Sequence, residues 1–339
     1  MEIYDKNNEI LLKEFNNNYK SNLDLNCTKI DVFNCNILDK GLSLLCCINF
    51  STKIEKLLLE DNNISSITPL SHISFGDNLL SLDLSSNKIS SIDILSKVNF
   101  PSLNHLYLNN NSISNIDSVC NFKFPNLLEL HLSSNKISSI DILIKANFPN
   151  LRELLLSKNE ICSIDALSNV HFPNLKILTL NSNKINSIEC LSEIKLDKIR
   201  ELKLEKNSLK SIKVLSKAKF PRLNYLSLGD DTLQDNLEGL KKTNFKKLED
   251  VCVYLNEKIN KKNQKITDII NFFENKGVSF NFIKYDKNGD EIFDKDINFM
   301  HNYDDDDDED DSSKENIINN VKSNDDDDYN NFLLREGLI

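Results

Sequence analysis

The sequence predicts an α/β solenoid, curved like a horseshoe, with parallel β-strands on its concave face and short helices on its convex face. A fourteen-residue pattern, LxxLxLxxNxIxxI, recurs seven times through the middle of the chain. Its asparagines are spaced by 25 residues once and by 24 residues five times. Five of the six prolines directly follow a phenylalanine at one position of the repeat. A period of this length is typical of stacked repeats, each of which packs on its neighbours.

The first half of each repeat predicts a short β-strand. In the LxL segment the two leucines point to one side and the intervening residue to the other. One such strand cannot bury its apolar face, so neighbouring copies must pair in parallel and join their leucines in one core. Each repeat brings about five large apolar side chains, each worth roughly 1.5–3 kcal/mol when fully buried. The copies begin at Ile54, Leu79, Leu103, Leu127, Leu151, Leu175 and Ile199.

An asparagine ends each predicted strand. Its short amide can hydrogen-bond backbone groups in the turn, and stacked copies would form a ladder that satisfies otherwise unpaired peptide groups. We expect this structural ladder at Asn62, Asn87, Asn111, Asn135, Asn159, Asn183 and Asn207. An eighth copy begins at Leu223 with Asp231 in the asparagine position. Strands of degenerate repeats are expected around Ile30 and Val251.

The second half of each repeat predicts a short helix that returns the chain to the next strand. An acidic residue follows the last isoleucine and is a favoured helix N-cap, and proline disfavours helix in the residue before it. The large phenylalanine before the proline is expected to fill the core from the convex side. The acidic positions are Asp93, Asp117, Asp141, Asp165 and Glu189, and the phenylalanines are Phe100, Phe124, Phe148, Phe172 and Phe220.

These residues closely resemble the leucine-rich-repeat family over roughly residues 50–255. The isoleucine-rich form of the pattern resembles the subclass found in the nuclear phosphatase regulatory subunit and in dynein-associated light chains, which has a shorter repeat. The resemblance implies a horseshoe fold whose partners bind the concave face. It also implies that the chain binds another protein. We expect no enzyme, because no stretch of the chain is left over to house a catalytic domain.

The concave face offers one candidate site in the middle repeats. Equivalent residues on adjacent strands lie about 5 Å apart, so one mixed surface is expected from His105, Tyr107, Glu129, His131, Glu153, Leu155 and Ile177. Its aromatic, imidazole, carboxylate and aliphatic groups suit a protein-binding hot spot, and the alternative is a solvated strand face without a dedicated partner. A metal or acid–base site at His105, Glu129 and His131 is a third interpretation. We expect no metal, no cofactor and no catalytic residue there.

Composition narrows the remaining function classes. No glycine lies between Gly76 and Gly229, which excludes a glycine-rich phosphate loop from the repeats. Residues 301–339 carry 14 acidic and 3 basic side chains, which accounts for the whole net charge of −11. The rest of the chain is neutral, so no overall electrostatic attraction to nucleic acid or membranes is expected.

The eight cysteines show no paired metal-binding spacing, and only Cys46 and Cys47 suggest redox chemistry. Lacking a signal-peptide pattern or a bilayer-length apolar run, the chain is expected in the cytoplasm, with the nucleus as an alternative.

Four segments are expected along the chain: an N-terminal cap with a degenerate repeat (1–50), the repeats (51–256), a C-terminal helix and β-hairpin cap (257–300) and a disordered acidic tail (301–339). The helix is expected over Ile266–Asn275, and the hairpin over Val278–Tyr285 and Glu291–Phe293. The segment Asp286–Asp290 resembles the start of a calcium-binding loop, but Glu291 replaces the required glycine, so a hairpin turn is expected. The tail is either solubilising or a short recognition segment.

The sequence therefore favours a monomeric intracellular scaffold or adaptor that holds a protein partner on its concave face. The alternative is an acid-tailed regulator that binds basic proteins such as histones, or a protein phosphatase. Repeats followed by an acidic tail resemble the acidic leucine-rich nuclear phosphoprotein family, and that resemblance suggests the alternative. The sequence is also compatible with a structural spacer that has no specific partner.

Overall fold

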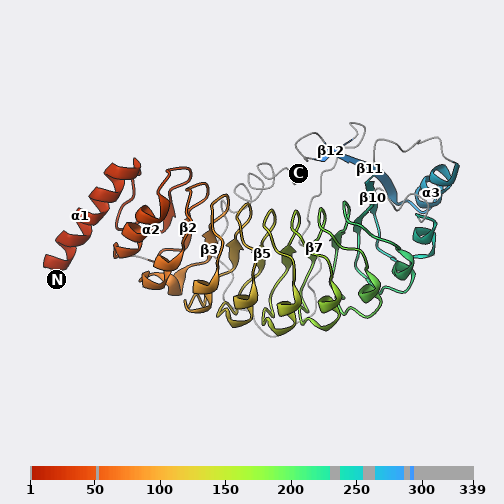
Figure 1. Cartoon of the computed structure of the whole chain (residues 1–339), viewed down its shortest axis with the longest axis horizontal. Coiled ribbons are helices and arrows are strands. Elements are labelled where there is room, and N and C mark those ends of the chain that lie inside the picture. Colours follow the sequence, from red (N-terminus) through yellow and green to blue (C-terminus); the bar gives the residue numbers. More distant parts are fainter. Residues whose placement is uncertain (1, 51–52, 230–236, 255–263, 286–290, 294–339) are drawn as a thin grey trace, which may run out of the picture. The chain divides into compact units, whose positions relative to one another are not determined.

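The structure is a computed structural model that describes residues 2–50, 53–229, 237–254, 264–285 and 291–293 (Figure 1). It comprises two compact units, Met1–Asn281 and Phe282–Ile339. The expected turn at Asp286–Asp290 and the expected acidic tail of residues 301–339 lie outside the described residues.

A continuous parallel sheet runs through the first unit. Its strands follow one another in chain order, each pairing with the next in register, as shown by Leu106 opposite Leu130 and Leu130 opposite Leu154. The strands are β1 (Lys29–Asp31), β2 (Lys56–Leu58), β3 (Ser81–Asp83), β4 (His105–Tyr107), β5 (Glu129–His131), β6 (Glu153–Leu155), β7 (Ile177–Thr179), β8 (Glu201–Lys203), β9 (Tyr225–Leu228) and β10 (Asp250–Tyr254). This confirms the predicted α/β solenoid, in which strands two dozen residues apart become neighbours.

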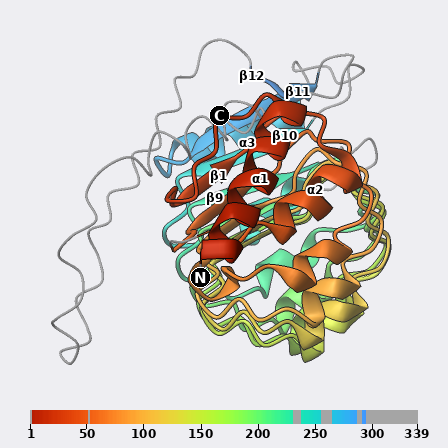
Figure 2. The same ribbon diagram turned by 90° about the vertical axis from the view of Figure 1, so that its left-hand side faces the viewer.

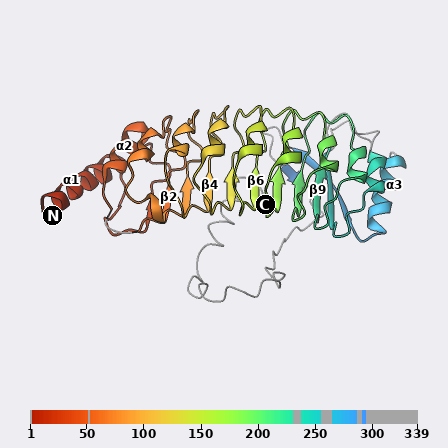
Figure 3. The same ribbon diagram turned by 90° about the horizontal axis from the view of Figure 1, so that it is seen from below.

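Short helices cover the opposite side of the repeats, as the end-on and lower views show for the first unit (Figures 2 and 3). They are η1 (Thr68–His72), η2 (Gly76–Asn78), η3 (Asp93–Ser96), η4 (Asp117–Asn121), η5 (Asp141–Lys145), η6 (Asp165–Asn169), η7 (Glu189–Ser192), η8 (Lys213–Ser216) and η10 (Leu237–Lys242). All of these are 3₁₀ helices. Few residues separate the last isoleucine from the phenylalanine, and a 3₁₀ turn covers more length per residue than an α-turn.

The expected N-cap role of the acidic residues was wrong. Asp93 and its equivalents are the first residues of their helices, and the isoleucines in the N-cap position make no side-chain cap. Instead, the Asp93 backbone N–H donates to Oγ of Ser91 at 3.2 Å, and the Asp165 N–H donates to Oγ of Ser163 at 3.1 Å. The serine two residues earlier therefore satisfies a backbone group at the start of the helix.

The core lies between the sheet and these helices and consists of columns of equivalent side chains. In the repeat that contains β5, the five pattern residues are fully buried: Leu127, Leu130, Leu132, Ile137 and Ile140. The predicted phenylalanine column is also buried, with Phe100 and Phe124 stacked at a centroid distance of 5.7 Å and Phe148 and Phe172 at 6.4 Å. The apolar residues of the repeat pattern thus form the inner sides of the sheet and of the helical layer and fill the core between them.

Other elements flank the repeats. At the N-terminal end, α1 (Glu2–Tyr19) packs on α2 (Leu38–Cys47), and buried Ile30 lies in the worn strand β1. At the C-terminal end, α3 (Gln264–Glu274) overlaps the expected helix, begins two residues earlier and ends one residue earlier, and packs on η10. Strand β11 (Ser279–Tyr285) begins in the first unit, where the Ser279 N–H donates to the Glu249 carbonyl at 2.7 Å. In the second unit β11 pairs antiparallel with β12 (Glu291–Phe293).

Candidate functional site

The sheet brings the seven candidate residues onto four adjacent strands, β4 to β7. Two rows result. His105, Glu129, Glu153 and Ile177 are successive partners in the first row, and Tyr107, His131 and Leu155 are successive partners in the second row. We call these seven residues the sheet-face patch. Because adjacent strands pair in parallel without a shift in register, side chains 24 residues apart in the sequence lie next to each other on the sheet.

Glu129 is the centre of the patch. Its Oε2 accepts a hydrogen bond from the Tyr107 phenol at 2.8 Å and lies 3.1 Å from Nδ1 of His105. The His105 and Tyr107 rings are nearly parallel, with centroids 6.2 Å apart. Because these contacts link β4 to β5, they hold the carboxylate in one orientation on the strand surface.

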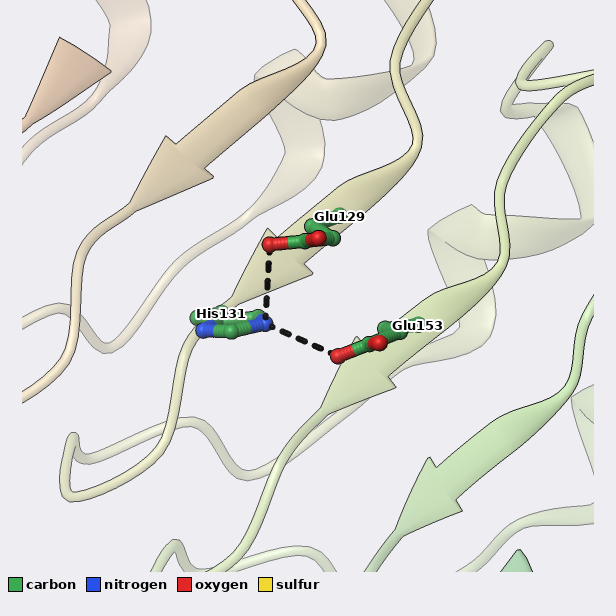
Figure 4. A group of neighbouring side chains, drawn as sticks. All are labelled: Glu129, His131 and Glu153. Atoms are coloured by element: carbon green, nitrogen blue, oxygen red, sulfur yellow. Dashed lines mark ion pairs between the residues drawn. The ribbon is translucent and has the colours of Figure 1, made fainter. Parts of the chain in front are cut away.

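His131 lies between two carboxylates. Its Nε2 is 3.8 Å from Oε2 of Glu129 and 3.5 Å from Oε2 of Glu153, and Figure 4 shows the imidazole edge facing both groups. The His131 side chain is fully buried, whereas those of Glu129 and Glu153 are 13% and 16% exposed. The Tyr107 ring packs against the imidazole with a centroid distance of 4.8 Å. The patch is therefore a packed polar cluster with two carboxylates at its surface.

The electrostatics of the cluster follow from this packing. Burial alone would raise the pKa of Glu129, but hydrogen bonding and attraction from His105, with further contributions from His131 and Tyr107, lower it. Burial alone would lower the pKa of His105, but its contact with Glu129 raises it. Burial, reinforced by Glu129, raises the pKa of Tyr107 well above its ordinary value. Glu129 is therefore held as a carboxylate, and the Tyr107 phenol remains a donor.

The two aliphatic residues differ in accessibility. Both belong to the surface predicted from the sequence, but Leu155 is buried, whereas Ile177 is partly accessible. The register places Leu155 between His131 and Thr179, both of which are also buried. Ile177 is therefore the aliphatic member of the patch with a surface available to a ligand.

The asparagine positions form regular hydrogen bonds between repeats. Oδ1 of Asn135 accepts from the Ile113 N–H at 3.0 Å, and Nδ2 donates to the Leu108 and Leu132 carbonyls at 2.9 and 3.0 Å. The same type of acceptor contact involves Asn62, Asn87, Asn111, Asn159, Asn183 and Asn207. The residue before each of these seven asparagines adopts a left-handed conformation, such as Ser134 with φ 55°. The amide therefore supports a tight turn that lacks glycine.

Two features of this face lie outside the seven-residue site predicted from the sequence. Asp83 lies opposite Tyr107 in the register, and burial raises the pKa of its carboxyl despite hydrogen bonds from Ser85. Two residues after the ends of β3, β4, β6, β7 and β8, a buried polar row contains Ser85, Asn109, Ser157, Asn181 and Glu205. In this row the Ser157 hydroxyl donates to Asn181 Oδ1, and the Ser227 hydroxyl donates to Glu205 Oε2. Their position outside the leucine pattern was visible in the sequence, but their burial was not.

Burial separates the cysteine thiols into protected and accessible groups. All eight cysteines are free. Burial raises the pKa of the Cys46, Cys190 and Cys252 thiols to about 12, which keeps them protonated at neutral pH. Cys47, next to Cys46, is exposed.

Family models match the repeats described above. The model of the NXF1/2/3/5 leucine-rich repeat domain matches residues 137–213, and the model of paired leucine-rich repeats matches residues 77–121 and 101–145. The chain is a leucine-rich-repeat protein. Family membership supports a general protein-binding role for the leucine-rich-repeat array. Comparison with curated proteins gives no match.

Solved structures with similar folds include two internalins from Listeria monocytogenes. Internalin inlF is 21% identical with a TM-score of 0.47, and the match covers 71% of this chain and 63% of that chain, which is less than two thirds of its length. Internalin C2 is 20% identical with a TM-score of 0.48, over 72% of this chain and 92% of that chain. The PEPR1–AtPEP1 complex matches at 20% identity and a TM-score of 0.47, over 68% of this chain and 32% of that chain. At these values the matches carry no inference about what the leucine-rich-repeat protein binds.

Within the described part of the chain, the helices lack the combination of length and apolar character that spanning a bilayer requires.

Proposed function

We propose that the leucine-rich-repeat protein is an intracellular scaffold or adaptor that holds a protein partner on the sheet-face patch. The observation that carries this proposal is the hydrogen bond between Tyr107 and Glu129, which joins two strands and fixes an aromatic ring beside a carboxylate. Binding hot spots are enriched in aromatic residues whose side chains are already ordered, because less conformational entropy is lost on association. The partly accessible Ile177 extends the patch by an aliphatic surface.

The chemistry of the patch indicates what the partner presents. Glu129 and Glu153 lie on neighbouring strands and keep part of their surface accessible. A carboxylate pair of this kind accepts hydrogen bonds from an arginine or lysine side chain, and an arginine can engage it through several donors. We therefore propose a partner segment that places a basic side chain over the carboxylates and an apolar side chain against Ile177.

The test is partner capture by full-length protein from a native lysate, with each captured protein quantified by mass spectrometry. We expect the double variant Tyr107→Ala/Ile177→Ala to reduce capture of the specific partner at least about tenfold. The matched control is Tyr225→Ala, which removes a tyrosine from β9 on the same face but outside the patch. Equal capture by both variants, with circular dichroism showing that both are folded, contradicts the proposal.

A tail-deleted chain, lacking residues 301–339, separates the main proposal from the alternative of an acid-tailed regulator of basic proteins or a phosphatase. Under the main proposal, tail deletion changes capture by less than about twofold. Under the alternative, the deletion abolishes capture and its dependence on salt, because 14 of the acidic residues are removed.

The proposal also includes a monomeric chain in the cytoplasm or nucleus, without nucleic-acid or membrane partners and without catalysis. It is supported by the even balance of charge outside residues 301–339 and by a family whose members typically act as interaction modules. Sedimentation of the purified chain tests the monomeric state, and imaging of the tagged protein in its own cells tests the location.

A further inference from the structure

The sheet-face patch contains a set of metal-ligand atoms that converge from two adjacent strands. One ligand atom each from Glu129, His131 and Glu153 lies within 4.8 Å of the others. The imidazole edge of His131 faces both carboxylates (Figure 4). Nδ1 of His105 lies 3.1 Å from Oε2 of Glu129, beside but outside the three residues whose ligand atoms converge. The sequence suggested His105, Glu129 and His131 as an alternative metal site, and the structure adds Glu153.

The distances between these donors match a compact coordination site. In a tetrahedral zinc site with bonds of about 2.0–2.2 Å, neighbouring donor atoms lie roughly 3.3–3.6 Å apart. Nε2 of His131 is 3.5 Å from Oε2 of Glu153 and 3.8 Å from Oε2 of Glu129. Small rotations of the two carboxylates are therefore sufficient to bring the donors around one ion.

The surroundings also fit a bound cation. Two carboxylates on neighbouring strands repel each other, and a divalent ion between them would remove that repulsion. Glu129 accepts a hydrogen bond from the Tyr107 phenol at 2.8 Å, which occupies one of the roughly four lone-pair positions of its carboxylate. Hydrogen bonds of this kind orient ligating carboxylates in known metal sites.

We propose that Glu129, His131 and Glu153, together with His105, bind a divalent first-row transition metal of the Zn²⁺ type. Imidazole with carboxylate favours such an ion, whereas Ca²⁺ and Mg²⁺ favour sites made of oxygen donors alone. The ion would lock β4, β5 and β6 together at the centre of the patch. The ion and the basic side chain of the proposed partner would compete for Glu129 and Glu153, so this inference is tested on the purified chain without a partner.

The experiment titrates Zn²⁺ into the purified, chelator-treated full-length protein by calorimetry and measures retained zinc by elemental analysis. A parallel titration with Co²⁺ reports coordination through its visible absorption. We expect one ion per chain, and at least about tenfold weaker binding in the variant Glu153→Gln, which keeps the side-chain shape and removes the charge. Absence of binding up to about 1 mM, an affinity of only about 4 kcal/mol, overturns the proposal.

The matched control is Glu201→Gln, because Glu201 holds the same strand position on β8 and is as little exposed as Glu153. Glu201 is paired with Lys203 at 2.9 Å, so its removal should leave zinc affinity unchanged. If Glu153→Gln does not fold, His105→Gln carries the same test at a more accessible position. Zinc binding that survives Glu153→Gln and disappears after alkylation of the cysteines assigns the ion to thiols and also overturns the proposal.

Discussion

The Tyr107 phenol on β4 donates a hydrogen bond to Oε2 of Glu129 on β5 at 2.8 Å, so two residues 22 positions apart in the sequence act as one unit on the sheet. The variant Tyr107→Phe keeps the ring and removes this bond to a charged acceptor. We expect the free energy of unfolding to fall by about 1–2 kcal/mol, measured by urea denaturation without added metal. A double-mutant cycle with Glu129→Gln should give a coupling of roughly 1 kcal/mol, and additive effects would show that the bond contributes nothing.

The asparagine ladder should contribute much more stability than other asparagines. The variant Asn135→Ala leaves the Ile113 N–H and the Leu108 and Leu132 carbonyls without their partner. We expect a loss of about 2–4 kcal/mol in urea denaturation, because buried backbone groups are left unsatisfied. The control is Asn126→Ala, an exposed amide with a single bond to the Pro101 carbonyl, which should cost less than about 1 kcal/mol. Similar losses in both variants would contradict a special role for the ladder.

The phenylalanine column should be equally sensitive to truncation. Phe148 is buried and stacks with Phe172, so Phe148→Ala removes a ring from a packed interior. We expect a loss of about 3–5 kcal/mol, measured as the shift of the urea transition. Phe33→Ala is the control, because Phe33 is 43% exposed and its truncation leaves no cavity. An equal shift for both variants would show that the column does not fill the core.

Asp39 links α2 to the next repeat and gives a pH dependence of stability. Its carboxylate accepts the Ser65 and Ser66 N–H groups at 2.6 and 2.9 Å. Burial tends to raise the pKa of Asp39, but hydrogen bonds from Ser65 and Ser66 lower it below its ordinary value. Since the folded pKa is below the unfolded one, the carboxylate stabilises the fold above about pH 4, and this contribution is lost as the pH falls through the folded pKa.

The variant Asp39→Asn should therefore be about 1 kcal/mol less stable than the natural chain at pH 7, with the difference shrinking at pH 3. Urea denaturation at both values measures it. Asp93→Asn, which alters an exposed carboxylate, should show no such difference. A difference in the free energy of unfolding that stays constant with pH would mean that the charge of Asp39 does not contribute to stability.

Thiol labelling should follow burial. Cys47 and Cys162 are exposed, whereas Cys46 and Cys252 are buried and their pKa values are raised to about 12. Iodoacetamide at neutral pH should modify the first pair at least about tenfold faster, because the thiolate is the reactive form. Peptide mass spectrometry measures the rates, and labelling in denaturant should remove the difference. Rapid modification of Cys252 in the native chain would contradict its buried position.

The sequence by itself determined the repeat, the parallel strands and the buried columns. Each of these is a local property that recurs every two dozen residues. The burial of Leu130 and Phe148 can therefore be predicted from their residue type and their position in the repeat. It also determined which side chains share a face, because residues alternate along a strand. The sequence did not determine the type of the short helices. The few residues between Ile92 and Phe100 must span the convex side, and a 3₁₀ helix covers more length per residue than an α-helix.

The tertiary structure alone decided which of the face residues act together. The sequence placed Glu129, His131 and Glu153 on one surface, but only the register and the rotamers bring their ligand atoms within 4.8 Å of one another. Likewise, Leu155 and His131 are buried although they occupy positions that alternate away from the core. The physical reason is that contact between neighbouring strands depends on side-chain direction and packing, which a one-dimensional pattern does not encode.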